Sequence, residues 1–531
     1  MKKVENSQVK HYSIRDKSVL YSPNMASSLL ISRQILVPFF VLAACSVFAG
    51  EKPAWTQHGG NAQHTAVSPV PMQKLERILW QSPVDKVPQY SGSSLLTHYM
   101  SPLFTNDDTI VMTVKTTATG GFVIEGRKSQ NGKLKYSFPT DWTMPPAGWK
   151  PVCGTALVPN AKNKRQYMVA VAAAGGRVII RESADDAVSK TKTICFFGEA
   201  NYKANPASYN AGIAINTPLT VDNEGNIYFG FQAVADTPLH LKSGVAKINY
   251  NGSVSYTSIS AATSGSSTGK VPTNSAPGLS NDGKTLYFAT NEGTPYLVGI
   301  ATSNLAPKYK VRMADPSSGN DALILDLGTA SPMIAPDNSV FFGILENPFP
   351  ANHDRGWMLH FSSSLNQINI SGNFGWDNTA SIVPRSAVPS YTGTAPYLIF
   401  SKYNDYYGIG GAGHNRIAVL DPFATQTDPV TNATIMKEVI TVLAPTHDPG
   451  KPADAVTEWC INSAAIDPSG KCALVNCEDG KAYRYDFKTN TLSQTVTLTA
   501  GLGEAYTPSV IGPDGRGYCI NNGILFCIGS R

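Results

Sequence analysis

The chain has 531 residues, 15% of them charged, and a formal net charge of +5 at pH 7. Residues 1–50 hold six basic and two acidic side chains, which account for +4 of this charge and leave +1 for the rest. A nearly neutral body without a run of Lys or Arg excludes a nucleic-acid-binding protein, which needs clustered cations to displace the counterions of the phosphates.

Glycine (45 residues) and proline (36 residues) are abundant, which favours short strands and tight turns over long helices with charged faces. A chain of this length normally divides into two or three domains unless a repeat lets one domain grow by adding units. The composition therefore predicts an all-β class.

The first element in chain order is an apolar run from Ile35 to Ala49, preceded by Arg33. Fifteen residues are too few to span about 30 Å of hydrocarbon as a permanent helix, so the run predicts a secretory signal peptide. We expect residues 1–49 to be this signal, with Met25 as an alternative start, residues 50–531 to form a single domain, and the mature chain to have no transmembrane span.

Two cleavage sites compete within the signal region. Val47-Phe48-Ala49 places small residues where signal peptidase I cleaves, whereas Leu42-Ala43-Ala44-Cys45 resembles a lipobox that would anchor the chain through a lipid on Cys45. We favour simple secretion, to the periplasm or the exterior, because Ser46 to Ala49 is unusually apolar for the segment after a lipidated cysteine.

Similar segments then recur along the chain, each with a small residue, a short apolar run, an Asp/Asn/Gly turn and an apolar or aromatic strand. This pattern is typical of a β-hairpin. The clearest copies begin at Ser101, Thr217, Ala276, Ser331, Ser463 and Thr507, with weaker units from Gly154 and about Thr379.

The prolines of these segments give the period, because the 406 residues from Pro102 to Pro508 divide into seven units of 58 residues. Four strands per unit at this period predict an eight-bladed β-propeller of antiparallel blades. The last unit ends after three strands, so we expect the segment Leu75 to Val84 to pair in this final blade and close the ring.

Seven cysteines follow the signal region, and an odd number leaves at least one thiol unpaired or in an intermolecular bond. Cys519 and Cys527 flank an Asn-Gly turn and either face each other across the hairpin or are buried apolar thiols. The chain has no CxxC pair and no histidines at metal-ligand spacing. Its sequence therefore does not indicate a structural metal site.

The segment from Trp55 to Pro69 resembles the W-x-x-x-G-G-N-x-x-x-T-x-x-S-P motif of the pyrroloquinoline-quinone-type, or quinoprotein alcohol dehydrogenase-like, propeller superfamily. The resemblance covers about residue 54 to the end and implies the fold. Dehydrogenases of this superfamily use adjacent cysteines, a Ca²⁺ or lanthanide ion and a catalytic Asp beside the quinone. No two cysteines are adjacent here, so the resemblance does not carry the cofactor, PQQ or Ca²⁺, to this chain. Non-catalytic relatives, including the propeller lipoprotein of the outer-membrane barrel-assembly machinery, make a scaffold role a serious alternative.

Ligands of propellers bind where the innermost strands begin, at one mouth of the central channel. The repeats align Ser101, Thr217, Ala276, Ser331 and Thr507 there, either as a hydroxyl ring or, better supported, as small residues required by crowding. Four further mouth candidates are able to ligate a hard cation or to tie blades together: Glu458, Asn462, Glu504 and Tyr506.

The sixth unit contains the most unusual segment, a Gly-rich loop from Lys402 to Arg416. It is not a phosphate loop, because it lacks the GxxxxGK[ST] order and precedes a strand. Its charged and polar candidates are Lys402, Asn404, Asp405, His414 and Arg416, and the alternative is a hairpin insertion without a site.

These features predict an exported propeller that acts as a non-catalytic binding or scaffold protein in the cell envelope, monomeric, with a cell-envelope protein or polysaccharide as partner. The alternative is a quinoprotein-like or metal-dependent oxidoreductase with its site at the channel mouth. The chain contains no HExxH motif that would indicate a metalloprotease.

Overall fold

The computed structural model describes residues 54–530, except 93, 146–149, 327–329 and 501–507. Strands dominate, as the composition predicted, and the helices are short. They are α1 (Glu199–Ala204), α2 (Pro206–Gly212), α3 (Ile259–Ala262) and the 3-10 turns η1 (Ala174–Gly176) and η2 (Arg385–Ala387). No helix in these residues has the length and apolar character needed to cross a membrane.

Antiparallel sheets, most of them four-stranded, follow one another along the chain, and all but the last are made of consecutive strands. The first four are β5 (Leu103–Phe104) to β8 (Leu134–Thr140) through β6 (Thr109–Thr117) and β7 (Gly120–Lys128); β10 (Thr155–Asn160) to β13 (Thr191–Cys195) through β11 (Asn163–Ala173) and β12 (Arg177–Arg181); β14 (Ile213–Ile215) and β15 (Thr220–Val221), which both pair with β16 (Ile227–Ala233), then β17 (Gly244–Ile248) and β18 (Val254–Ser258); and β19 (Gly278–Leu279) to β22 (Pro307–Arg312) through β20 (Thr285–Ala289) and β21 (Tyr296–Ala301).

The second half of the chain continues the same pattern. Its sheets are β23 (Met333–Ile334), β24 (Val340–Ile344), β25 (Trp357–Phe361) and β26 (Gln367–Gly372); β27 (Ser381–Pro384), β28 (Tyr397–Tyr403), β29 (Arg416–Thr427) and β30 (Thr434–Leu443); β31 (Ala465–Asp467), β32 (Cys472–Asn476), β33 (Lys481–Asp486) and β34 (Thr491–Thr497); and β35 (Val510–Ile511), β36 (Gly517–Asn521) and β37 (Ile524–Gly529) with β1 (Arg77–Pro83). One parallel contact, Ser371 with Ile435, joins β26 to β30. Two small ladders pair β2 (Tyr90–Ser91) with β3 (Ser94–Leu95) and β4 (Thr97–His98) with β9 (Lys150–Pro151).

The hairpins form because their turn residues satisfy their own backbone. Between β15 and β16, the Asp222 carboxylate accepts a hydrogen bond of 2.9 Å from the backbone N–H of Asn226. Gly225 takes the positive φ of +82° that this tight turn requires. Such local bonds make Asx-Gly segments reliable turn signals, which is why the repeat was visible in the sequence.

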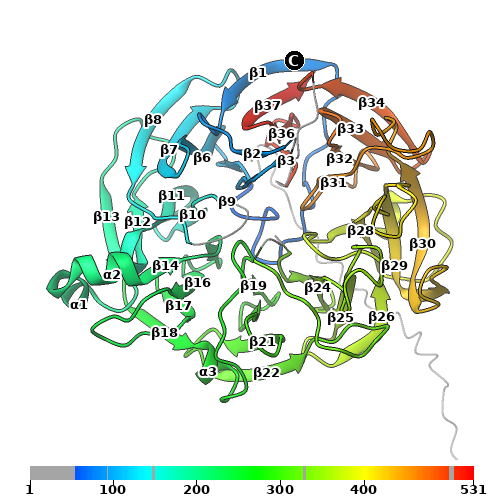
Figure 1. Ribbon diagram of the computed structural model, residues 1–531. Coiled ribbons are helices and arrows are strands. Elements are labelled where there is room, and N and C mark those ends of the chain that lie inside the picture. Colours follow the sequence, from blue (N-terminus) through cyan, green and yellow to red (C-terminus); the bar gives the residue numbers. More distant parts are fainter. Residues whose placement is uncertain (1–53, 93, 146–149, 327–329, 501–507, 531) are drawn as a thin grey trace, which may run out of the picture. The chain divides into compact units, whose positions relative to one another are not determined.

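Within residues 54–530 the sheets surround a common centre, with the short first strand of each sheet innermost (Figure 1). This arrangement is consistent with a β-propeller. Aromatic side chains fill the spaces between sheets, as where the rings of Phe104 and Tyr518 lie 4.5 Å apart between the first and last sheets.

The N-terminal strand closes the last sheet, as predicted. Strand β1 pairs antiparallel with β37, from Arg77 opposite Gly529 to Pro83 opposite Ile524. Figure 1 shows the blue β1 beside the red β37 at the C-terminal end of the chain. Trp80 of β1 also donates its indole N–H to Ser129 O at 2.7 Å, which ties the last sheet to the first.

The seven cysteines of the described part are buried thiols. Cys519 lies opposite Phe526, and Cys527 lies opposite Tyr518. The expectation that the two thiols face each other across the hairpin is therefore wrong, because the register offsets them, and the alternative of buried apolar thiols is correct.

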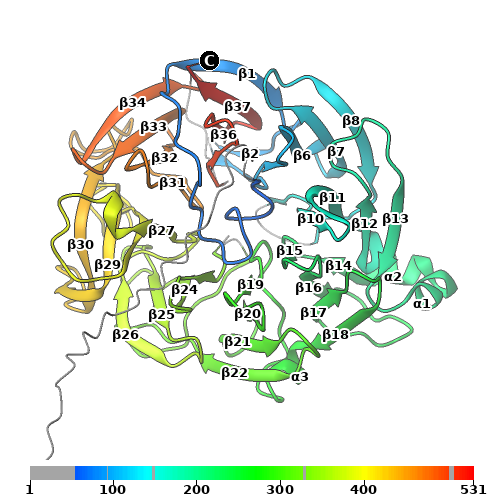
Figure 2. The same cartoon turned by 180° about the vertical axis from the view of Figure 1, so that it is seen from behind.

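Residues 55–68, which we call the channel plug, cross the centre of the ring and bond to one inner strand after another (Figure 2). Most of these contacts are ladder-like backbone bonds, and glutamine side chains supply the others. The pairs are Trp55 with Phe104, Thr56 with Leu157, Gln57 with Val221, Gln63 with Leu279 and Ile334, Thr65 with Ile382, and Ser68 with Ile466.

The spacing of the Trp55 motif has a physical explanation in this plug. Asn61 accepts hydrogen bonds from the backbone N–H groups of Gln63 and Thr65 and donates to Thr65 Oγ1 at 2.7 Å. Gly60 lies against the Trp55 ring, where a Cβ would come within 3.1 Å. The motif therefore encodes a compact loop that closes one end of the channel.

Candidate functional site

The small residues aligned by the repeat lie at the end of the channel where the inner strands begin, which we call the channel mouth. Ser101, Thr217, Ala276 and Ser331 are all buried there, and Thr507 lies outside the described residues. Ser331 Oγ accepts from the backbone N–H of Ala276 at 2.9 Å, and the Ser331 N–H donates to Thr379 Oγ1 at 3.0 Å. These bonds link neighbouring inner strands and support the packing interpretation.

Two groups of candidate residues that the sequence placed separately meet at Asp377, just before β27. Lys402 Nζ forms an ion pair with Asp377 Oδ1 at 2.5 Å, and Asn462 Nδ2 donates to the Asp377 backbone carbonyl at 3.0 Å. The Lys402 and Asp377 side chains are only 2% and 3% exposed. The Gly-rich loop and the channel mouth therefore contribute to a single site.

Asn404 joins the same site to the segment that carries Glu458. Its side chain accepts from the Trp459 N–H at 3.2 Å and donates to the Trp459 carbonyl at 3.1 Å. Among the residues that the structure describes, Glu458, Cys460 and Glu478 form the one group of three His, Cys, Asp or Glu whose ligand atoms lie within 4.8 Å of one another. Glu504 and Tyr506, the other mouth candidates, lie outside the described residues.

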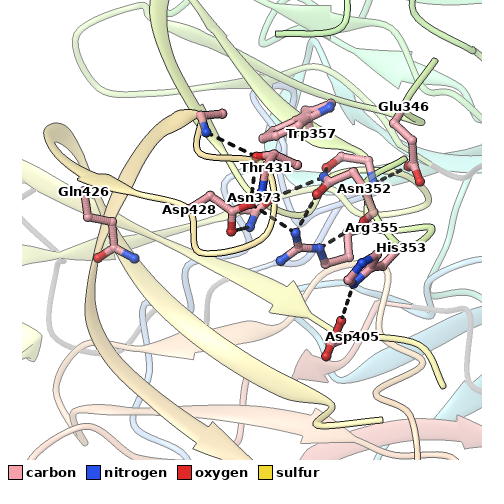
Figure 3. Close-up of polar contacts among 12 residues, drawn as sticks. Glu346, Asn352, His353, Arg355, Trp357, Asn373, Asp405, Gln426, Asp428 and Thr431 are labelled. Atoms are coloured by element: carbon pink, nitrogen blue, oxygen red, sulfur yellow. Dashed lines mark hydrogen bonds and ion pairs between the residues drawn. The ribbon is translucent and has the colours of Figure 1, made fainter. Parts of the chain in front are cut away.

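The remaining loop candidates make contacts within the loop and with its neighbours. Asp405 Oδ1 lies 3.1 Å from His353 Nδ1 (Figure 3), and His414 Nε2 lies 3.1 Å from Asp454 Oδ2. Arg416 begins β29, opposite Leu443 of β30. These contacts fix the shape of the loop around Lys402.

A second carboxylate pair belongs to the connection between β24 and β25. The buried Glu346 carboxylate accepts hydrogen bonds from the backbone N–H groups of Asp354 at 2.7 Å and Gly356 at 2.8 Å (Figure 3). Burial and the carboxylates of Glu346 and Asp377 raise the pKa of Asp354 to about 7. Asp354 is thus a carboxyl group that exchanges a proton near neutral pH, beside the buried Lys402.

A buried polar network holds this connection in place. Arg355 Nη2 donates to Asn352 Oδ1 at 2.5 Å and lies 3.3 Å from Asp428 Oδ2, while Asn373 donates to the other oxygen of Asp428. Figure 3 shows these groups converging between the two neighbouring sheets. Since the donors are paired with acceptors across two sheets, the loop that carries Asp354 is rigidly positioned.

Burial dominates the protonation states at the mouth. It raises the pKa of Tyr406 far above the usual value, and the nearby carboxylates of Asp377 and Glu458 raise it further. Burial, reinforced by the Lys402 cation, lowers the pKa of His98 to about 3. At neutral pH the site therefore presents a protonated phenol and a neutral imidazole beside several carboxylates.

Below the mouth, a cavity of about 10 Å³ separates the channel plug from the inner strands. This is room for about one water molecule. Its lining comes from the plug and from residues that precede inner strands: His58, His98, Tyr99, Met100, Pro218, Asn274, Asn462 and Pro508.

The sequence reasoning missed Asp354 and Asp377, and it set His58 and His98 aside because the histidines show no local ligand spacing. One class of mouth residue was visible in the sequence. In three of the units an Asn directly precedes the aligned small residue, at positions 216, 378 and 462. Asp377 directly precedes Asn378 and was accessible to the same alignment. His58 and His98 were not, since neither lies in the repeat.

No family model matches the chain, and no curated protein matches it. Solved propellers do match in structure. The quinohemoprotein alcohol dehydrogenase from Comamonas testosteroni aligns with 90% of this chain and 77% of its own at 11% identity and a TM-score of 0.54. A europium-containing methanol dehydrogenase aligns over 88% and 89% at 9% identity and a TM-score of 0.52. BamB from Moraxella catarrhalis aligns over 85% and 100% at 10% identity and a TM-score of 0.46.

The likenesses to the two dehydrogenases confirm the predicted resemblance to the quinoprotein-like propellers at the level of the fold. The described residues do not fit the quinone that this fold family implies. Lys402, the cation at the mouth, is already paired with Asp377, and the surrounding groups are carboxylates that repel a tricarboxylate quinone. The cavity has room for about one water molecule, and no two cysteines of the sequence are adjacent.

Proposed function

We propose that the protein is an exported, non-catalytic binding protein, an eight-bladed propeller that takes a small cationic ligand at its channel mouth. The observation that carries this proposal is the contrast between the two channel ends. The plug closes one end, whereas buried or half-buried carboxylates, among them Asp354, Asp377 and Glu458, gather at the other. Clefts lined by one sign of charge raise the local concentration of the opposite charge.

The blade count treats β23–β26 and β27–β30 as two blades. It is supported by the single residue pair that joins them, Ser371 with Ile435, where strands within a sheet share several. With the closing sheet this gives eight blades at the period of 58 residues read from the sequence.

Export, and with it a location in the cell envelope, is supported by the apolar run from Ile35 to Ala49, which lies outside the described residues. The alternative, an oxidoreductase with its site at the mouth, has one observation in its favour. Asp354 has a pKa of about 7, a value suited to general acid or base chemistry.

A thermal-melt panel on the purified exported protein tests the proposal. The probes are Ca²⁺, Zn²⁺, Cu⁺ and spermidine, each added separately, because a ligand that binds only the folded chain raises its melting temperature. We expect at least one cation to raise it, and Glu478→Gln at the mouth to reduce the shift. Glu224→Gln is the matched control, because this carboxylate pairs with Lys164 on the surface, where its side chain is 77% exposed.

Two outcomes overturn the proposal. The first is a melting temperature that no cation in the panel changes. The second is reduction of an electron-accepting dye in the presence of PQQ, Ca²⁺ and a primary alcohol, which establishes the oxidoreductase instead.

A further inference from the structure

The cavity between the plug and the mouth is lined by an unusual set of donor atoms. His58 comes from the plug, and His98 and Met100 come from the segment that leads into β5. The cavity of about 10 Å³ has room for one water or one ion, but not for an organic ligand.

His58 is the clearest sign that this cavity receives a ligand. The residue is 5% exposed, and its Nε2 atom is buried without a hydrogen-bond partner. A buried polar atom without a partner is unfavourable, so native structures normally satisfy it. The neighbouring Gln57 is fixed by two hydrogen bonds to Val221, of 2.7 and 3.0 Å, which hold the His58 backbone in place.

His98 and Met100 line the same cavity as His58. His98 lies in β4, paired with Pro151 of β9, and its side chain is buried. Each imidazole binds a metal through one ring nitrogen, while its other nitrogen keeps its own hydrogen bond.

We infer that the cavity holds a single copper ion, bound by His58 Nε2, a ring nitrogen of His98 and the thioether of Met100. This inference rests on the proposed function and names its cationic ligand. Neutral imidazoles suit several transition metals, but a thioether is a soft donor that selects copper, above all Cu⁺. A hard cation such as Ca²⁺ requires oxygen ligands and would find too few in this cavity.

The charges around the cavity agree with a cation. Lys402 is a buried cation close to His98, but its charge is compensated by Asp377 at 2.5 Å. The carboxylates of Glu346 and Glu458 then add negative charge at the mouth. An incoming cation is attracted toward the mouth before it reaches the imidazoles below.

Titration of the purified exported protein with Cu⁺, under ascorbate and against the competing chelator bicinchoninate, tests the inference. We expect one equivalent of tightly bound copper. His58→Gln and Met100→Leu should each weaken binding at least about tenfold, the loss that even indirect changes at metal sites produce. X-ray absorption of the copper-loaded protein should show a sulfur neighbour that Met100→Leu removes.

His240→Gln is the matched control, since this imidazole pairs with Asp236 on the surface and its side chain is 75% exposed. Met100→Leu conserves volume and keeps the test valid if His58→Gln fails to fold. Unchanged copper affinity in both variants overturns the inference. So does loss of binding in Cys460→Ser or Glu478→Gln instead, which moves the ion to the mouth. If spermidine or Zn²⁺ binds and copper does not, the inference fails while the proposed function stands.

Discussion

The two ends of the channel are built from different kinds of sequence. At the plugged end, residues close in the chain contact one another: Asn61 bonds Thr65, and Gly60 packs against Trp55. At the mouth, the contacts join distant residues, such as Lys402 with Asp377 and Asn462 with the same aspartate. A contiguous motif therefore encodes the closed end, whereas the open end depends on how the sheets are arranged.

This difference separates stability from function. The plug uses its polar groups to bind the inner strands, so its motif identifies the fold and is silent on activity. The mouth buries charged groups, which costs free energy. Such clusters of buried charges are typical of functional sites, including binding sites. His58 connects the two ends, because it is a residue of the plug and lines the cavity next to the mouth.

The largest change in stability is expected at the mouth, when one member of the buried ion pair is removed. Lys402→Met leaves the buried Asp377 carboxylate without its cation, and removing one partner of a buried pair costs about 3–5 kcal/mol. Urea denaturation should show this loss. The double variant Lys402→Met with Asp377→Asn should recover most of it, because neither a charge nor an ion pair remains.

A second buried pair serves as the control for this prediction. Lys115 Nζ and Asp85 Oδ1 lie 2.8 Å apart with both side chains fully buried. We expect Lys115→Met to destabilise the fold as well, but only Lys402→Met to enlarge the cation-induced rise in melting temperature. Equal cation responses in the two variants would show that Lys402 is a structural group only.

The plug offers the next largest effect, through Gly59. This residue has φ +60°, and a Cβ on it would lie 2.6 Å from His64 Cα, so Gly59→Ala adds a backbone clash to a strained conformation. The left-handed backbone costs about 1–2 kcal/mol and the overpacking about 1–3 kcal/mol. Gly92→Ala, also at φ +60° but with nothing within 4 Å, should show only the first cost. A similar melting temperature for both variants would contradict the clash.

Much of the fold was predictable because its signals are local. The Asp/Asn-Gly turns satisfy their own backbone, and the strands of the repeat follow at a regular distance, so hairpins and period were visible. The pairing of β1 with β37 followed from the missing fourth strand of the last unit. The register of Cys519 and Cys527 was not predictable, because a shift of one position on one strand changes which residues face each other.

The candidate site was predictable only in part. Lys402, Asn404 and Asn462 were singled out for their unusual local sequence, and the structure brings them to one place. Asp354 has no local peculiarity, and Asp377 was visible only as the residue before Asn378. The pKa of Asp354 depends on burial and on the carboxylates of Glu346 and Asp377, and the fold brings Asp377 close to Asp354 although the two lie 23 positions apart in the sequence.

The smallest effect concerns Asp354 and depends on pH. Its pKa is raised from an ordinary 3.8 to about 7 in the folded protein, so between these values the folded chain keeps a proton that the unfolded chain has released. Stability should therefore fall as pH rises through this window and level off above pH 7.

Asp354→Asn removes this contribution and tolerates the φ of +61° at this position. Between pH 5 and pH 8 we expect the variant to gain stability relative to the natural chain. The measurement is the midpoint of urea denaturation at both pH values, on the same preparation of each protein. Asp108→Asn, at the same φ of +61° in the turn between β5 and β6, isolates any backbone effect. Parallel pH profiles for Asp354→Asn and the natural chain would mean that burial and the carboxylates of Glu346 and Asp377 do not raise the pKa of Asp354.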